Sequence, residues 1–173
     1  MRQFYDTWTT PVGDFSVALD ANGAVIATAF GGVVELRPRF AADELEQAPE
    51  RTASVRREIT EYFFGARQQF TLKLSPSGTP FQQSIWTALQ QIPFGETRTY
   101  GGLATSIGNP NASRAVGRAN AMNPICLIVP CHRVIGGDGA LTGFAFGEEI
   151  KQRLLEHEKA VLQANVASPL AGI

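Results

Sequence analysis

A short segment at residues 75–80, Ser-Pro-Ser-Gly-Thr-Pro, divides the chain into two halves whose apolar residues follow different periods. Before it, apolar and polar residues alternate as in β-strands, and after it apolar residues recur every three or four positions as in helices. Serine, proline and glycine in succession are typical of a linker. The sequence therefore predicts an α+β protein with a β-rich domain at 1–75, a mainly helical domain at 76–163 and a tail at 164–173.

The first half has the pattern of a β-meander followed by one helix. Alternating runs predict three strands, at residues 2–8, 15–19 and 24–30. The pair Asn22-Gly23 is a strong hairpin signal. Residues 41–50 are acidic and polar and predict a loop or a short helix, after which helical spacing from Val55 predicts a helix that stops at Gly65.

The second half predicts a series of helices with recognisable caps. Thr79 and Pro80 begin the first of these helices. Two shorter ones are expected at 100–107, capped by Thr99, and from Asn111 to Met122. Two short helices across a Gly-containing turn match the helix-turn-helix pattern, but an ordinary antiparallel helix pair has the same spacing, so both interpretations stay open.

The remaining segments predict a strand, a loop and a last helix. Residues 125–129 are apolar and predict a strand that ends at Pro130, followed by a glycine-rich loop. The last helix is expected at about 147–158, with residues from 163 onward as a loosely held tail.

Composition narrows the classes of function. The chain has 173 residues, of which 44% are apolar and 18% charged, enough for a substantial core. Its start lacks the apolar stretch of a signal peptide and no run is long enough to span a membrane, so we expect a cytoplasmic protein without membrane contact. The two cysteines are expected to be free thiols, and with only two histidines a metal site is not expected. Residues 95–135 contain four arginines and one acid, which is compatible with a polyanionic partner.

One pair of neighbours, Cys131 and His132, combines a nucleophile with a base at the end of a predicted element. A thiolate forms only if the chain turns there, because adjacent side chains of an extended strand point apart. A cysteine in an apolar run is more often a small buried hydrophobe, and this is our interpretation of Cys126.

Residues 123–136, Asn-Pro-Ile-Cys-Leu-Ile-Val-Pro-Cys-His-Arg-Val-Ile-Gly, resemble the active-site stretch of the O6-alkylguanine-DNA alkyltransferases. The resemblance extends over 78–158, and the first half fits the family in its layout of sheet and then helix. It implies a ribonuclease H-like N-terminal domain and a C-terminal domain with a helix-turn-helix and an active-site loop. It also implies irreversible, single-use transfer of an alkyl group from O6-alkylguanine to the protein itself, without a cofactor.

The resemblance assigns a role to five residues of the reaction. Cys131 would accept the alkyl group, and His132 would deprotonate it through a bridging water. Glu158 would hold the imidazole in the correct tautomer. Tyr100 would help to rotate the damaged nucleotide and donate a proton towards the guanine ring, and Asn123 would brace the turn between the DNA-binding helices and the active site.

The resemblance also assigns residues to DNA and substrate binding. Arg114 would fill the gap left by the extruded nucleotide in a complex formed through the minor groove. The other residues expected at the DNA are Ala112, Ser113, Ala115, Gly117, Arg118 and Thr99. The guanine pocket would be formed by Val134, Gly143, Phe144, Ala145 and Phe146. Arg133 is expected to be structural, pairing with a carboxylate or with backbone carbonyls.

Phe146 departs from the family pattern, in which a glycine usually stands at this position. We expect its ring at the pocket edge to disfavour large adducts such as benzyl relative to methyl, with stacking on the flipped base as the competing role.

The expected partner is double-stranded DNA that contains O6-alkylguanine, with no obligate protein partner. Activity on O4-alkylthymine and cooperative self-association along DNA stay open. Three other functions are compatible with parts of the sequence: a non-catalytic damage sensor, a helix-turn-helix regulator and a thiol hydrolase unrelated to DNA.

Overall fold

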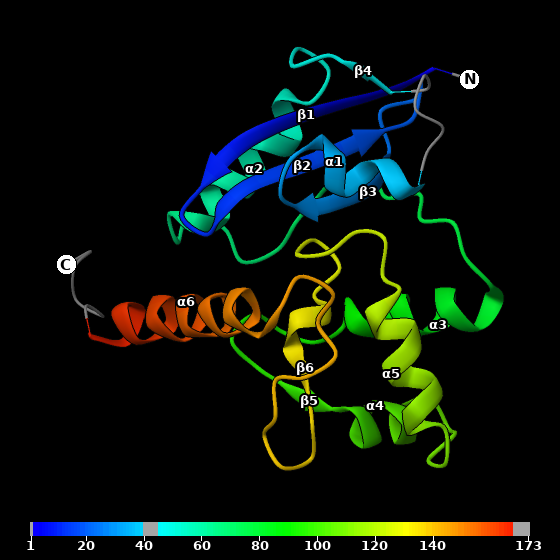
Figure 1. Cartoon of the computed structure of the whole chain (residues 1–173). Coiled ribbons are helices and arrows are strands. Elements are labelled where there is room, and N and C mark those ends of the chain that lie inside the picture. Colours follow the sequence, from blue (N-terminus) through cyan, green and yellow to red (C-terminus); the bar gives the residue numbers. More distant parts are fainter. Residues whose placement is uncertain (1, 40–44, 168–173) are drawn as a thin grey trace.

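Four strands form a mixed sheet in the first half, in the order β3-β2-β1-β4 (Figure 1). The computed structural model describes residues 2–39 and 45–167. The strands are β1 (Gln3–Thr10), β2 (Gly13–Leu19), β3 (Val25–Phe30) and β4 (Leu45–Gln47). The first three are antiparallel neighbours, which confirms the predicted meander.

β4 corrects the prediction of a loop or short helix at residues 41–50, of which 41–44 lie outside the described residues. It pairs in parallel with the start of β1, so that Gln3 lies opposite Leu45. A run with so few apolar residues carries little strand signal of its own, and pairing with an existing edge supplies the hydrogen bonds.

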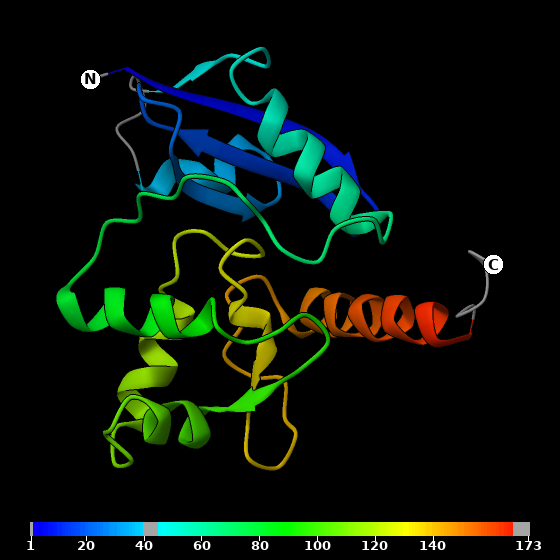
Figure 2. The same ribbon diagram turned by 180° about the vertical axis from the view of Figure 1, so that it is seen from behind.

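Helices cover both faces of this sheet. α2 (Ala53–Phe63) lies across one face and α1 (Val33–Leu36), followed by the 3₁₀ turn η1 (Arg37–Arg39), lies against the other (Figures 1 and 2). α2 buries Val55, Ile59 and Tyr62, as its helical spacing predicted.

The segment that leads into the predicted linker forms backbone hydrogen bonds with Val25, the first residue of β3. The amide of Val25 donates to the carbonyl of Lys73 over 2.8 Å, and the amide of Ser75 donates to the carbonyl of Val25 over 2.8 Å. α3 (Pro80–Leu89) then begins at the predicted cap, where Thr79 and Gln82 exchange side-chain and backbone bonds in a capping box.

The predicted helix pair is formed by α4 (Tyr100–Ser106) and α5 (Ser113–Ala121). Thr99 caps α4 by accepting the amide of Gly102 over 2.9 Å, as expected. Asn111 does not cap α5, which corrects that prediction. The N-cap residue is Ala112, which has no side-chain cap, because the chain is still turning where the amide of Ala112 donates to the carbonyl of Asn109 over 3.0 Å.

The predicted strand at 125–129 is wrong, because this segment folds back on itself. The amide of Val129 donates to the carbonyl of Ile125 over 2.9 Å, and Leu127 has a φ of 72°, in the left-handed region. An apolar run can be buried as a compact turn as well as in a strand, and its composition does not distinguish the two. Cys126 lies within the turn and Cys131 follows it, and both are buried thiols outside any disulfide.

After this turn the chain forms a 3₁₀ turn and a short strand. The 3₁₀ turn η2 (Cys131–Arg133) leads into β6 (Val134–Ile135), which pairs in parallel with β5 (Arg98–Thr99).

The last helix, α6 (Glu148–Ala167), runs past the end we expected near Glu158. Val161 and Leu162 beyond that point pack against the main core, so the helix has a surface to cover there. Of the expected tail, residues 168–173 lie outside the described residues.

The two halves share one core. A single cluster of buried side chains contains Phe15 and Tyr62 from the first half and Cys131 and Leu154 from the second. Thr28 of β3 also bonds across the boundary, since its hydroxyl donates to the carbonyl of Cys126 over 2.8 Å. Within the described residues, no helix combines the length and apolar character needed to cross a membrane.

Candidate active site

Cys131 lies at the first residue of η2, at the base of a tightly bonded turn. Its residue is 5% exposed, and its amide donates to the carbonyl of Val129 over 2.8 Å. The side-chain amide of Asn120 donates to the carbonyl of Cys131 over 3.3 Å. The turn that the sequence required between a nucleophile and its neighbour is therefore present.

His132 forms a buried pair with Glu158 of α6. Its Nε2 lies 2.7 Å from Oε2 of Glu158, and both side chains are fully buried. A carboxylate can only accept, so Nε2 carries the proton and Nδ1 holds the lone pair of the neutral ring. Nδ1 is buried and without a hydrogen-bond partner among the described residues. Burial outweighs the attraction of Glu158 and lowers the pKa of His132, so the ring is a neutral base near pH 7.

Glu158 accepts hydrogen bonds from four residues, of which His132 is one. Arg133 donates its Nε to Oε1 over 2.9 Å and its Nη2 to Oε2 over 3.1 Å, which confirms the expected structural pairing. The amide of Gly95 donates to Oε1 over 3.0 Å, and the hydroxyl of Tyr62 donates to Oε2 over 2.7 Å. Burial by itself would raise the pKa of Glu158, but His132 and Arg133 outweigh it and hold that pKa well below its usual value.

Asn123 lies where a brace for the turn is needed. Its Nδ2 donates to the carbonyl of Val129 over 2.9 Å, and its Oδ1 accepts the amide of Ile125 over 3.0 Å. The side chain therefore closes both ends of the segment that leads to Cys131.

Tyr100 lies at the start of α4, in contact with the loop after β6. Its hydroxyl donates to the carbonyl of Thr142 over 2.9 Å. Gly143 has a φ of 87°, and a Cβ there would come within 2.6 Å of that hydroxyl, so only glycine permits the approach. Burial first and the charge of Cys131 second raise the pKa of Tyr100.

The loop is also held by a buried lysine that the sequence did not single out. Nζ of Lys151 donates to the carbonyl of Val134 over 2.5 Å, and its residue is 0% exposed. Burial lowers the pKa of Lys151, while Cys131 acts in the opposite direction.

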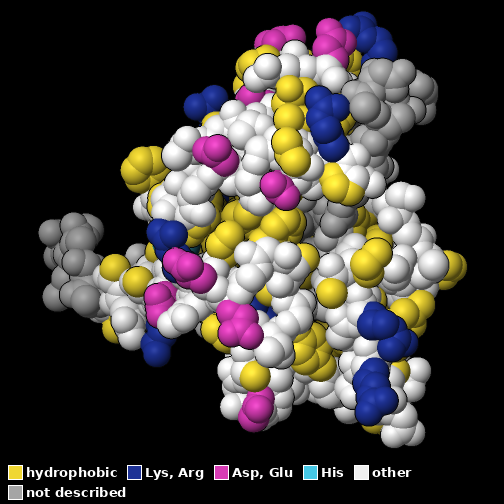
Figure 3. Space-filling view, in the orientation of Figure 1, with side chains coloured by type: hydrophobic (Ala, Val, Ile, Leu, Met, Phe, Trp, Pro, Cys, Tyr) yellow, Lys and Arg dark blue, Asp and Glu magenta, His cyan; other side chains and the backbone are white. Residues whose placement is uncertain are grey.

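An open groove of about 400 Å³ runs from Tyr100 across α5. Its lining consists of Tyr100, Arg114, Gly117, Arg118, Ala121, Thr142 and Gly143. Arg114 and Arg118 are exposed, and Ala112, Ser113 and Ala115 are half-buried at the start of the same helix. Figure 3 shows Lys and Arg side chains gathered over this part of the molecule, at the lower right of the view. The groove thus brings three of the seven residues expected at the DNA, Arg114, Gly117 and Arg118, beside Tyr100 and Gly143.

The two aromatic side chains of the loop after β6, Phe144 and Phe146, do not line this groove. The ring centroid of Phe146 is 5.6 Å from that of Phe30 in β3, and Phe144 is 6.2 Å from Phe30. Ala145 between them is exposed, whereas Val134 is buried. Phe146 therefore packs against the N-terminal sheet, and we revise the expectation that its ring limits the size of the adduct.

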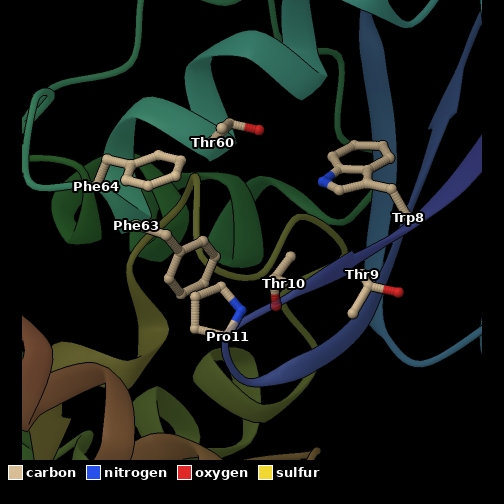
Figure 4. A pocket seen from close by; sticks show the side chains of 7 residues that line it. All are labelled: Trp8, Thr9, Thr10, Pro11, Thr60, Phe63 and Phe64. Atoms are coloured by element: carbon tan, nitrogen blue, oxygen red, sulfur yellow. The ribbon is translucent and has the colours of Figure 1, made fainter.

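A second hollow, of about 310 Å³, lies on the N-terminal half between the β1–β2 turn and α2 (Figure 4). Its lining consists of Trp8, Thr9, Thr10, Pro11, Thr60, Phe63 and Phe64. Its lining contains no thiol, imidazole or carboxylate side chain. Among the described residues, no group of three or more His, Cys, Asp or Glu side chains is placed to hold a metal ion.

Comparisons with known proteins agree with this site. A family model described as the DNA binding domain of 6-O-methylguanine DNA methyltransferase matches residues 80–160. A methylated-DNA–protein-cysteine methyltransferase of Methanosarcina acetivorans is 45% identical over 90% of this chain and 97% of its own. The constitutive one of Bacillus subtilis is 40% identical over 90% and 95%. The crystal structure of Mycobacterium tuberculosis OGT in complex with DNA has a TM-score of 0.83 at 39% identity, over 91% and 94%. The chain therefore belongs to the 6-O-methylguanine DNA methyltransferase family.

Proposed function

We propose that this protein repairs DNA by direct reversal, transferring the alkyl group of O6-alkylguanine to Sγ of its own Cys131. The observation that carries the proposal is the buried relay behind Cys131. There, a neutral imidazole donates from Nε2 to a carboxylate and keeps an unpaired basic nitrogen at Nδ1. The relatives named methylated-DNA–protein-cysteine methyltransferase support it.

The relay accounts for each proton and bond. The proton of Cys131 moves to Nδ1 of His132 through a bridging water, and Glu158 stabilises the imidazolium through Nε2. The thiolate attacks the alkyl carbon in line, so that the S–C bond forms as the O6–C bond breaks. Guanine leaves with the electron pair and takes up a proton, towards which Tyr100 contributes. The thioether that remains is not readily reversed, so each chain reacts once and needs no cofactor.

α4 and α5 act, in this proposal, as a helix-turn-helix that enters the minor groove. Small residues at the start of α5 allow close approach of the backbone to DNA without base-edge readout. Arg114 fills the gap left when the damaged nucleotide is flipped into the site, which offsets part of the unstacking cost. Its exposed position beside the groove near Tyr100 supports this role.

The N-terminal domain, residues 1–75, is proposed to have a ribonuclease H-like fold, and residues 76–163 the DNA-binding and transfer functions. Methyl is the proposed adduct. Activity on O4-alkylthymine and cooperative self-association along DNA are two further properties that we propose to test separately.

Intact-protein mass spectrometry after incubation with excess duplex containing O6-methylguanine tests the proposal. We expect a gain of about 14 Da that maps to Cys131 and stops at one equivalent, and no gain in Cys131→Ala, which still binds duplex. Binding without a mass gain would favour a damage sensor. Repeated turnover of an ester or peptide would favour a thiol hydrolase.

A further inference from the structure

The N-terminal half places one polar side chain in contact with the relay. Tyr62 of α2 is 0% exposed, and its hydroxyl lies 2.7 Å from Oε2 of Glu158. That oxygen is the same one that accepts Nε2 of His132, also over 2.7 Å. The tyrosine and the imidazole therefore share one acceptor atom.

The ring of Tyr62 is fixed on several sides. Its centroid lies 5.0 Å from Phe63, 5.0 Å from His157, 5.8 Å from Phe70 and 5.9 Å from Phe94. His157 also bonds to the carbonyl of Tyr62 over 2.9 Å. Burial first and Glu158 second raise the pKa of Tyr62 well above its usual value, so the hydroxyl keeps its proton and acts as a donor.

We propose that Tyr62 is a positioning residue that sets the basicity of His132 by donating to the oxygen of Glu158 that the imidazole also uses. Each donor to a carboxylate oxygen leaves less negative charge for the others, so the Tyr62 hydroxyl, beside Nη2 of Arg133, weakens the pull of Oε2 on the Nε2 proton. The imidazole then holds less tightly the proton that Cys131 gives up. This proposal rests on the function proposed above for Cys131.

Other charged groups also act on the imidazole of His132 and on the carboxylate of Glu158. Among the described residues, the other titratable or charged groups that act on His132, Glu158 or Tyr62 are Arg133 of η2 and Lys151 and His157 of α6. Removing the Tyr62 hydroxyl changes none of these residues, so a change in His132 can be assigned to the lost donor.

The test is an NMR titration of the imidazole nitrogens in Tyr62→Phe. The chain has two histidines, so His157→Gln suffices to assign their signals. We expect the pKa of His132 to rise by roughly half to one unit in Tyr62→Phe. Site-specific 3-fluorotyrosine at position 62 keeps the ring and makes its hydroxyl a stronger donor, so it should lower that pKa. The fluorinated protein also serves if Tyr62→Phe folds poorly.

Alkyl-transfer rates against pH provide the second readout. Tyr62→Phe should be about threefold slower than the wild type at pH 6 and differ by less than about twofold at pH 8, since more of its His132 is protonated in acid. Tyr5→Phe is the matched control, because Tyr5 packs in the cluster on the opposite face of the sheet.

An equal loss of rate at every pH with an unchanged His132 pKa would show that Tyr62 is merely structural and would overturn the proposal. If the wild type accepted no alkyl group, the function proposed for Cys131 would fail. The titration would still decide the effect of Tyr62 on His132.

Discussion

The two halves of the molecule contribute to the site in different ways. The second half supplies the thiol and the imidazole from η2 and the carboxylate from α6. The first half supplies Tyr62, which bonds to Glu158, and Phe30, against which the loop aromatics pack. Each of these two contacts depends on how the halves dock. The comparison teaches that a reactive motif can be recognised within a short stretch of sequence. The side chains that contact and position it come from segments far away in the chain.

The largest effect is expected from Glu158→Gln, because it removes the charge on which both halves converge. Arg133 would be left buried without its carboxylate, which costs about 3–5 kcal/mol in the free energy of unfolding. Urea denaturation measures this loss, and alkyl transfer should fall with it. A variant as stable as the wild type would show that the carboxylate does not hold the halves together.

Lowering the pH should reduce the stability of the wild-type protein, because it protonates Glu158. The pKa of Glu158 is lower in the folded than in the unfolded state. Its contribution is therefore present above the unfolded value of about 4.3 and is lost as the pH falls below it. Between about pH 5 and pH 2 the wild type should lose roughly 2 kcal/mol more stability than Glu158→Gln. Parallel curves for the two proteins would contradict this expectation.

A smaller effect is expected from Arg114→Ala, which should lower the rate of alkyl transfer only when the substrate is duplex DNA. Arg114 is exposed on α5, so stability should change little. Transfer from duplex should slow by about tenfold because the gap in the stack is left unfilled, while reaction with free O6-methylguanine base stays close to the wild-type rate. Arg118→Ala, on the same helix, is the comparison variant. Equal losses on duplex and free base would remove the proposed role of Arg114.

The smallest effect is expected from Phe146→Gly, which weakens the contact between the loop and Phe30. Loss of this edge-on ring pair should cost about 1 kcal/mol and speed amide exchange across residues 136–147. Methyl and benzyl adducts should be affected alike, because the ring lies on the sheet. A selective gain for benzyl would return Phe146 to the pocket edge.

The sequence predicted the parts of the fold whose signals are local. The meander, the Thr79 and Thr99 caps and α2 depend on neighbouring residues, and each was found. The strand predicted at 125–129 failed because the turn depends on Asn123, which bonds to both of its ends. Neither apolar content nor spacing reports such a bond.

The site shows the same division. The motif pointed to Cys131 and His132, and the resemblance pointed to Glu158. Tyr62 was recognised only as an apolar position of a helix, since spacing does not reveal that its hydroxyl meets a carboxylate far along the chain. Lys151 likewise has no sequence signal that separates a buried lysine from a surface one.

The hydroxyl of Tyr62 also limits how far this protein can be treated as modular. A fragment cut to residues 80–160, the span of the family model, would carry every reactive group and the arginines of α5. It would leave Glu158 without one of its donors and open the shared core to water. Grafting that fragment onto another support would keep the proposed effect on His132 only if the new partner presented a hydroxyl at the same place. The exchangeable unit is therefore the whole pair of halves.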